Sequence, residues 1–362
     1  MKKTIIWMLM LALILTLCAC GQKSAETAAA PTSAPAAPTP SAPESAAPAE
    51  TPKAQAIMGT LTLLNLTEEE CRIREGGKYI ALAYLEEQGV FHNDIPVADM
   101  PELAQVVYYD TLDAMLMALQ AGDITSAELP QCTADYLCAR NDKLAAKGSF
   151  DLSGADNFTK QVVLRLGVGF SFLTLEENTA LRDTLNEALD EMKADGTLDA
   201  LVKTHITDAV SGEPEPVAFT KTDGETLRVA ITGALPPMDY VAADGTPAGF
   251  NTAILAELGR RLNKNIELVQ VDSVGRAAAL ASRQVDMVFW TNGQDGRLNG
   301  GRMTVDAHNE YIKQEQTEEQ RALMKAIGAG IGYKKGQNMD IPEGTITTQT
   351  YYNDLLTAVT LK

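Results

Sequence analysis

Apolar residues recur along most of the chain either in short runs or at helical spacing, which predicts alternating strands and helices. An apolar run that begins at residue 59 predicts a strand. Thr67 and Glu70 follow with the spacing of a capping box, so we expect a helix there, interrupted by breaks. The stretch 104–129 predicts a strand, a helix stopped by Gly122, and a second strand.

The same alternation continues to residue 290. A short helix is predicted from Thr133, a strand over 164–173, and two helices within 177–206, separated at Asp195-Gly196. Beyond a stretch rich in Gly, Glu and Pro at 211–225, we expect a strand at 227–231, a helix at 249–263, a strand at 266–271, a helix at 273–282 and a strand at 285–290. This alternation indicates an α/β fold with a largely parallel sheet covered on both faces.

Residues 1–19 have the pattern of an export signal, with two lysines and an apolar run that is short for a membrane span. The letters "LCAC" at 17–20, followed by Gly21, resemble a bacterial lipobox. That resemblance implies cleavage before Cys20 and attachment of a lipid to its sulfur. A transmembrane anchor is the alternative.

Residues 20–56 are rich in Ala, Pro, Ser and Thr, which predicts an extended tether, with a glycosylated stalk as the alternative. The remaining chain suffices for two α/β lobes, at 57–210 and 226–362, joined by the 211–225 linker. A helix, a polar turn and a buried strand follow one another from Ala118 and again from Ala279, which favours two lobes of related build.

The net charge and the absence of certain motifs argue against several classes of function. The formal net charge of −18 argues against nucleic acid or an anionic membrane surface as a partner. The sequence carries no P-loop, no metal-type His/Cys spacing and no nucleophile elbow, so we expect no cofactor, no metal and no catalysis. Cys71, Cys132 and Cys138 are an odd number of thiols and are expected to be small buried residues; a Cys132–Cys138 disulfide is the alternative.

Several motifs resemble family 3 periplasmic solute-binding proteins, the binders of polar amino acids. "PPMDY…ADGTPAGFNTAILAELGRRL" and "RAAALASRQVDMVFW" resemble the first lobe of that family, and "YYDTLDAMLMALQAGDITSAEL" and "LRLGVGFSFLTLEENTALRDTLNEALDEMKADGTLDALV" resemble its second lobe and closing helices. The resemblance implies a two-lobed type 2 periplasmic-binding-protein fold, each lobe being a mixed, mostly parallel sheet flanked by helices.

The two lobes stand in reversed order along the chain. Residues 341–362 resemble the crossover strand of the family, in which Tyr351 and Tyr352 are expected to pack at the hinge. In the usual order that strand leads into the element that here begins at residue 59. We therefore predict a circular permutant whose new ends lie in a surface loop. Two degraded tandem copies are the alternative.

Ligands of such folds lie between the lobes, near loop tips and helix N-termini. The resemblance places Met238 and Tyr240 in the cleft, with Met238 at the usual aromatic position; a core or rim methionine is the alternative. Thr291 and Asn292 fall at the tip of the next strand, where Trp290 is expected either as a cleft wall or in the core.

Arg297 is the candidate for the family's clamp on a ligand carboxylate, with a solvent-exposed arginine as the alternative. From the other lobe, Thr67 matches the family's anion-binding threonine, or is a plain N-cap. The acid that holds a ligand amino group would fall near Pro130-Gln131, where Glu128 is the nearest carboxylate. This departure argues against an ordinary α-amino acid.

The expected function is that of a monomeric, lipid-anchored, extracytoplasmic protein that captures a small polar solute and delivers it to an ABC permease by hinge closure. The first alternative is a lipoprotein that senses a ligand or acts as a scaffold without transport. The second is an enzyme on the same scaffold, such as a cyclohexadienyl-type dehydratase, which would need a catalytic acid in the cleft. Residues 298–340 match no pattern beyond a predicted helix in "EQTEEQRALMKAIG".

Overall fold

Helices and strands alternate through residues 54–64, 68–212, 216–242, 244–292, 316–330 and 341–362, which the computed structural model describes. The predicted α/β class is confirmed. The predicted export signal, Cys20 and most of the tether lie outside the described residues. Within the described ranges, none of the helices combines the length and the apolar character that crossing a membrane requires.

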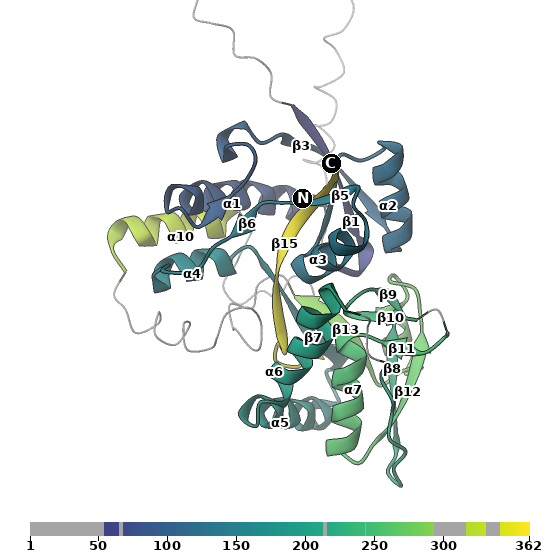
Figure 1. The fold of residues 1–362 in the computed structure, drawn as a ribbon. Helices are drawn as coiled ribbons and strands as arrows, with labels where there is room; N and C mark the ends of the chain where they lie inside the picture. Colours follow the sequence, from purple (N-terminus) through teal and green to yellow (C-terminus); the bar gives the residue numbers. More distant parts are fainter. Residues whose placement is uncertain (1–53, 65–67, 213–215, 243, 293–315, 331–340) are drawn as a thin grey trace, which may run out of the picture. The chain divides into compact units, whose positions relative to one another are not determined.

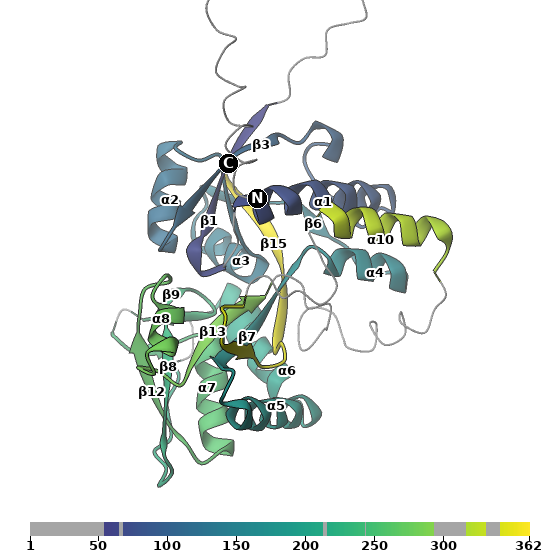
Figure 2. The ribbon, with the colours of Figure 1, turned by 180° about the vertical axis from the view of Figure 1, so that it is seen from behind.

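One group of elements, here called the β1 lobe, is built around three parallel strands. Its elements are β1 (Gln55–Leu61), the 3-10 turn η1 (Thr62–Leu64), α1 (Glu68–Glu87), β2 (Phe91–His92), β3 (Glu102–Tyr109), α2 (Leu112–Ala121), β4 (Ser126–Pro130), α3 (Gln131–Arg140), β5 (Leu144–Lys147), β6 (Ser149–Phe150), α4 (Asn157–Leu164) and α10 (Glu318–Gly330). Strand β1 pairs in parallel with both β3 and β4. Helix α10 packs on α1, as Figures 1 and 2 both show.

A second group, here called the β8 lobe, has the same plan. Its elements are β7 (Gly167–Leu175), α5 (Thr179–Ala194), α6 (Thr197–Val202), β8 (Thr226–Ile231), β9 (Ala234–Leu235), β10 (Asp239–Val241), β11 (Pro247–Ala248), α7 (Phe250–Arg261), β12 (Asn265–Gln270), α8 (Arg276–Ala281), β13 (Met287–Asn292) and β14 (Thr345–Thr347). Strand β8 pairs in parallel with β12 and β13, and β7 runs antiparallel to β13.

The last strand, β15 (Tyr352–Leu361), joins the two lobes into one mixed sheet with the order β12-β8-β13-β7-β15-β4-β1-β3. Its first residues, Tyr352–Leu355, pair with β7, and its later residues pair with β4 and β5. Figure 1 shows β15 in yellow running from one group of elements to the other. The chain therefore passes between the lobes along β15, and also at the start of β7, which follows α4 of the β1 lobe.

The C-terminal end of β15 and the N-terminal end of β1 lie on the same side of the sheet, where these two strands end and begin. Strand β4 is parallel to β1 and antiparallel to β15, and it lies between them. Neighbouring strands are about 4.8 Å apart, so these two ends are separated by about 10 Å across the strands.

The predicted linker 211–225 does not divide the chain in space. Residues 167–210 lie before it in sequence, yet β7 pairs with β13, and α5 and α6 pack on α7. The cause is the antiparallel β7–β13 ladder, which places these residues in the β8 lobe. Helix α10 likewise belongs to the β1 lobe, although it follows the elements of the β8 lobe along the chain.

Three helices differ from the prediction, one in its continuity and two in their first residue. Helix α1 is unbroken through Gly76-Gly77, because its packing on α4 and α10 outweighs the low helix propensity of glycine. Helix α3 begins at Gln131, where the buried Asp354 carboxylate accepts a hydrogen bond from Cys132 N at 2.7 Å. Helix α8 begins only at Arg276, because a turn closed by the side chain of Asp272 precedes it.

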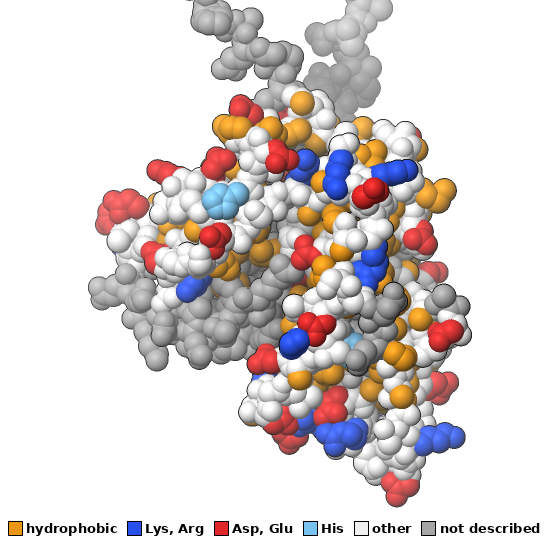
Figure 3. Space-filling model, viewed as in Figure 1, with side chains coloured by type: hydrophobic (Ala, Val, Ile, Leu, Met, Phe, Trp, Pro, Cys, Tyr) orange, Lys and Arg blue, Asp and Glu red, His pale blue; other side chains and the backbone are white. Residues whose placement is uncertain are grey.

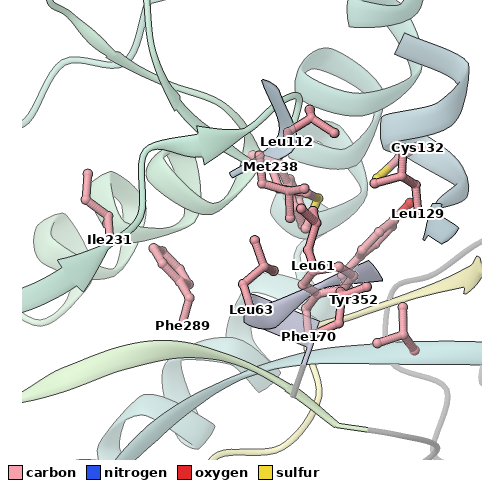
Figure 4. Close-up of a cluster of buried hydrophobic side chains, with 14 of the residues drawn as sticks. Leu61, Leu63, Leu112, Leu129, Cys132, Phe170, Ile231, Met238, Phe289 and Tyr352 are labelled. Carbon is pink, nitrogen blue, oxygen red and sulfur yellow. The ribbon is translucent and has the colours of Figure 1, made fainter. Parts of the chain in front are cut away.

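The main hydrophobic core runs through both lobes. It includes Leu61 and Leu129 from the β1 lobe, Val229 and Phe250 from the β8 lobe, and Tyr352 from β15. Figure 4 shows part of this cluster. Cys71 and Cys132 are buried and Cys138 is half-buried, each as a thiol, so the alternative of a Cys132–Cys138 disulfide is not observed.

Candidate functional site

A small cavity of about 20 Å³ lies where the two lobes meet. It is lined by Leu63, Phe170, Ala230, Thr232, Leu235, Asp239, Asn251, Arg276, Phe289, Trp290 and Thr291. A cavity of about 10–15 Å³ or more can hold one water molecule, so a larger solute needs the lobes to separate.

Arg276, the first residue of α8, is the central cation of this site. Its side chain is only 3% exposed, and it donates to three main-chain oxygens: Ser273 at 3.0 Å, Phe289 at 2.9 Å and Leu63 at 2.9 Å. Its guanidinium carbon lies 5.0 Å from the ring centroid of Trp290, within the range of a cation–π contact. Burial lowers the pKa of Arg276 to about 10, and the charge of Asp239 opposes that shift.

Asp239, the first residue of β10, supplies a buried carboxyl group. Its Oδ2 accepts hydrogen bonds from Gly233 N at 3.0 Å and from Thr232 Oγ1 at 3.2 Å. Burial raises the pKa of Asp239 to about 6, against the opposing effects of these hydrogen bonds and of the Arg276 charge. This carboxyl group therefore changes its protonation state near pH 6.

Leu63 in η1 is the point at which the β1 lobe enters the site. Its carbonyl oxygen accepts from Arg276 and also from Thr291 Oγ1, at 3.3 Å. In Figure 4 its side chain lies between Phe289 on one side and Phe170 and Tyr352 on the other. The carbonyl of Leu63 thus occupies the acceptor position that two donors of the β8 lobe share.

Further contacts between the lobes surround this point. Arg140 of α3 donates to the carbonyl oxygens of Ala209, Val210 and Gly212 at 2.8, 2.9 and 2.7 Å. The rings of Tyr136 and Tyr240 lie 6.3 Å apart. The lobes are therefore closed on each other along several elements.

The loop before α7 explains the predicted "GF" helix start. Gly249 has φ +104°, and a Cβ there would collide with the carbonyl of Met238. Only glycine adopts this conformation readily, and it lets the N–H of Asn251 reach Met238 O at 2.8 Å. Tyr351 Oη then donates to Asn251 Oδ1 at 2.8 Å, which ties the loop to the residue before β15.

Of the predicted residues in the β8 lobe, Trp290 and Thr291 line the cavity, and Trp290 also belongs to a buried core cluster. Met238 is fully buried in the main core and does not line the cavity. Tyr240 faces Tyr136, and Asn292 pairs with Gly169 at the end of β13. Arg297 lies outside the described residues.

Glu128 and Gln131, the described residues that were predicted in the β1 lobe, do not line this cavity. Thr67 lies outside the described residues. Gln131 donates to Asp135 Oδ1 at 2.6 Å, on its own helix. Glu128 is paired with Lys78 and lines a different, larger cavity inside the β1 lobe.

Sequence reasoning missed Arg276, Asp239, Asn251 and Leu63. The signal for Arg276 was present, because it is the one charged residue in the apolar stretch "RAAALA" that forms α8. Asp239 lies within the motif "PPMDY", between Met238 and Tyr240, the two residues that the resemblance places in the cleft. Leu63 acts through its main chain and left no side-chain signal.

The site can donate hydrogen bonds to an acidic or carbonyl-bearing group through Arg276 and Thr291, and it can exchange a proton at Asp239. Among the described residues, His, Cys, Asp and Glu side chains nowhere gather in a group of three that could hold a metal. Acidic and basic side chains are interspersed on the face of the molecule in Figure 3.

Residues 227–317 match the family model of bacterial extracellular solute-binding proteins, family 3. The resemblance predicted for this part of the chain is therefore confirmed. The family is described by the binding of solutes and not by a reaction. Its matched segment supplies β8, the Pro-Pro loop, α8 and β13, which form one wall of the cavity. No curated protein matches the chain.

Solved structures with some likeness include import proteins. One is the zinc-bound ligand-binding component of an ABC-type import system from Staphylococcus aureus (TM-score 0.34, 10% identity, 85% of this chain and 66% of that one). A second is NikA from Staphylococcus aureus with Ni(L-His)2 (TM-score 0.33, 10% identity, 71% of this chain and 57% of that one). A third is a putative L-cystine ABC transporter from Listeria monocytogenes (TM-score 0.31, 11% identity, 85% of this chain and 83% of that one). The chain thus spans less than two thirds of the length of the first two.

Proposed function

We propose that this protein is the solute-binding component of an ABC importer, that it captures a small polar solute between its lobes, and that a lipid on Cys20 anchors it outside the membrane. The observation that carries the proposal is the family match over residues 227–317, because this segment forms one wall of the interlobe cavity. The solute is an amino acid or a related compound that offers an acceptor group.

The proposed mechanism is a hinge closure around β7 and β15. When the lobes separate, Arg276 and Thr291 lose the Leu63 carbonyl and expose donors for the acceptor group of a solute. Trp290 forms the apolar side of the site, and Asp239 provides a buried acid. A bound solute then takes the place of Leu63 O and holds the lobes in the form that the permease recognises.

We also propose that the chain is a circular permutant of a two-lobed binding protein, with the tether 20–56 added before its new N-terminal end. Two features support this order. The strand β15 crosses the lobes at the C-terminus, and its end lies about 10 Å from the start of β1 across the strands.

A scaffold or sensor lipoprotein is the second candidate function. It is favoured by the small size of the cavity, about 20 Å³, and by the pairing of Arg276 with the main chain of Leu63. In this role the closed lobes would present a surface to a membrane partner without carrying a solute.

The test is a binding screen on the chain from residue 21, which omits only the export signal and the lipid site. Trp290 is its only tryptophan, so its fluorescence reports on the interlobe site. The screen covers amino acids, polyamines, quaternary amines, small peptides and nucleosides. A ligand at a hundred times its dissociation constant adds about 2.7 kcal/mol to stability, which a thermal shift detects.

For solute capture, one class of compound must raise the melting temperature and change the Trp290 emission. The variant Thr291→Val should weaken that compound about tenfold, since it removes one donor. Arg260→Gln, an exposed change on α7, should not. If no class shifts either signal, the scaffold role is favoured over transport. Loss of palmitate labelling in Cys20→Ser tests the anchor separately.

A further inference from the structure

The β1 lobe contains a cavity of about 290 Å³ that shares no lining residue with the interlobe cavity. It lies between α1 and the strands β1, β4 and β15, with the segment after α1 along one side. Apolar side chains form most of its wall, among them Met58, Leu82, Phe150, Leu166 and Leu356. Because a cavity of about 150 Å³ holds benzene, this one has room for an organic molecule of about ten non-hydrogen atoms.

Three charged side chains form one part of the wall. Lys78 Nζ lies 3.0 and 3.2 Å from the two carboxylate oxygens of Glu128 and 3.3 Å from Glu75 Oε1. The Glu128 and Glu75 side chains are only 6% and 14% exposed. Two carboxylates therefore share one ammonium, and the ionised group carries one uncompensated negative charge beside apolar surface.

That excess charge is costly unless a further cation meets it. A buried carboxylate without a full partner loses its hydration, and a structural ion pair would need only one of the two glutamates. Burial raises the pKa of Glu75, against the opposing effect of Lys78. A raised pKa is the direction expected for a buried carboxylate whose charge is not fully paired. The charge of Lys78 is secured by both glutamates, which raise its pKa.

Two further polar atoms of the cavity wall have a hydrogen-bonding capacity that the described residues do not use. Asn93 Oδ1 and Thr360 Oγ1 are buried and have no hydrogen-bond partner in the described part of the chain. Asn93 Oδ1 can only accept, and a hydroxyl oxygen can also accept. The wall thus offers acceptors and negative charge to a molecule that brings donors and positive charge.

We propose that this cavity is a second ligand site, which binds a small organic amine: its ammonium group pairs with Glu75 and its apolar body lies against Leu82, Phe150 and Leu356. An ammonium has three donors and no acceptor, which matches the unused acceptors of the wall. The site lies inside the β1 lobe and does not require the lobes to separate.

The test compares 4-phenylbutylamine with the neutral 4-phenylbutan-1-ol, by calorimetry on the chain from residue 21 at pH 7. Residues 52–362 form one compact unit, so the folded body is present in full. We expect the amine to bind at least about tenfold more tightly than the alcohol, equal to about 1.4 kcal/mol. Glu75→Gln should remove that preference. Glu68→Gln, an exposed change two turns earlier on α1, should leave it within about twofold.

Methionine methyl signals locate the binding. Met58 and Met100 line this cavity, whereas Met238 lies beside Asp239 in the other lobe. The amine should shift the signals of Met58 and Met100 and leave Met238 unchanged. A solute of the proposed transport function should instead change the emission of Trp290, which lines the interlobe cavity, so the two proposals fail separately.

The proposal is overturned if the amine does not bind, if the alcohol binds equally well, or if only Met238 responds. Equal binding of the amine to wild type and to a folded Glu75→Gln also overturns it. The comparison of amine and alcohol uses the unmodified chain, so it decides the matter even if the variant does not fold.

Discussion

The guanidinium of Arg276 donates a hydrogen bond to the carbonyl oxygen of Leu63, which lies 213 positions earlier in the chain and in the other lobe. Leu63 O also accepts from Thr291, so a single main-chain oxygen holds two donors of the facing wall. Because the donors are buried, they need an acceptor at all times. Opening of the lobes therefore requires water or a solute to replace this oxygen.

Arg276→Gln should destabilise the protein by about 2–4 kcal/mol, because it removes charge-assisted hydrogen bonds to Leu63 and Phe289 and leaves buried carbonyls without donors. Urea unfolding, followed by the emission of Trp290, measures the change. Arg260→Gln is the matched control, since Arg260 is exposed and pairs with Glu257 on its own helix; it should cost less than about 0.5 kcal/mol. Equal losses in the two variants would contradict the role of Arg276.

Asp239→Asn should change how stability depends on pH. The pKa of Asp239 rises from 3.8 to about 6 on folding, so the native state binds this proton more tightly than the unfolded state. Wild-type stability from this group is therefore full below pH 3.8 and falls as pH rises through 6. The difference between wild type and Asp239→Asn should shift by about 2.4 kcal/mol between pH 4 and pH 7. Urea unfolding at several pH values tests this, and a flat difference would show that Asp239 does not titrate in that window.

Gly249→Ala should destabilise by about 3 kcal/mol or more, because alanine disfavours a φ of +104° and its Cβ would collide with the Met238 carbonyl. Gly245→Ala is the control. Gly245 also has a positive φ, +86°, but a Cβ there meets nothing within 4 Å, so only the backbone cost of about 1 kcal/mol remains. Thermal unfolding of the two variants separates collision from backbone strain. Similar losses of stability in the two variants would contradict a collision at Gly249.

Restoring the usual lobe order should leave the fold intact. A chain that starts at residue 226, continues to 362, and then runs through a short glycine–serine linker into residues 54–212 keeps every pairing of the sheet. The linker spans about 10 Å across the strands, which four or five residues cover. We expect a cooperative melt within about 5 °C of that of the parent chain. Failure to fold would count against the permutation.

The elements of the β8 lobe were accessible to sequence reasoning because they are local. The strand and helix expected at 227–231 and 249–263 correspond to β8 and α7. The apolar periodicity and the Gly249 turn fix these elements without reference to distant residues. The placement of β7 was not accessible, because its partner β13 lies more than a hundred residues later. A ladder of that separation leaves no trace in either segment.

The candidate site was predictable only in part, for a similar reason. Trp290 and Thr291 follow from the motif at the end of β13, and both line the interlobe cavity. Leu63 contributes a main-chain oxygen, which every residue has, so its sequence letter carries no information about the contact. Glu128 was expected near the ligand because it is the nearest carboxylate in sequence. It instead faces Lys78 inside its own lobe, since strand β4 turns its side chain to the α1 side.

The position of β15 in the sheet determines when folding of the two lobes can be completed. Residues 352–361 follow all the other described elements along the chain, yet they form the strand between β7 and β4. Neither lobe can complete its hydrogen-bonded ladder until β15 is available. A chain threaded across a membrane from its N-terminus would consequently remain incompletely folded until β15 emerged. Late acquisition of structure would keep the polypeptide competent for passage and would place assembly of both lobes on the far side.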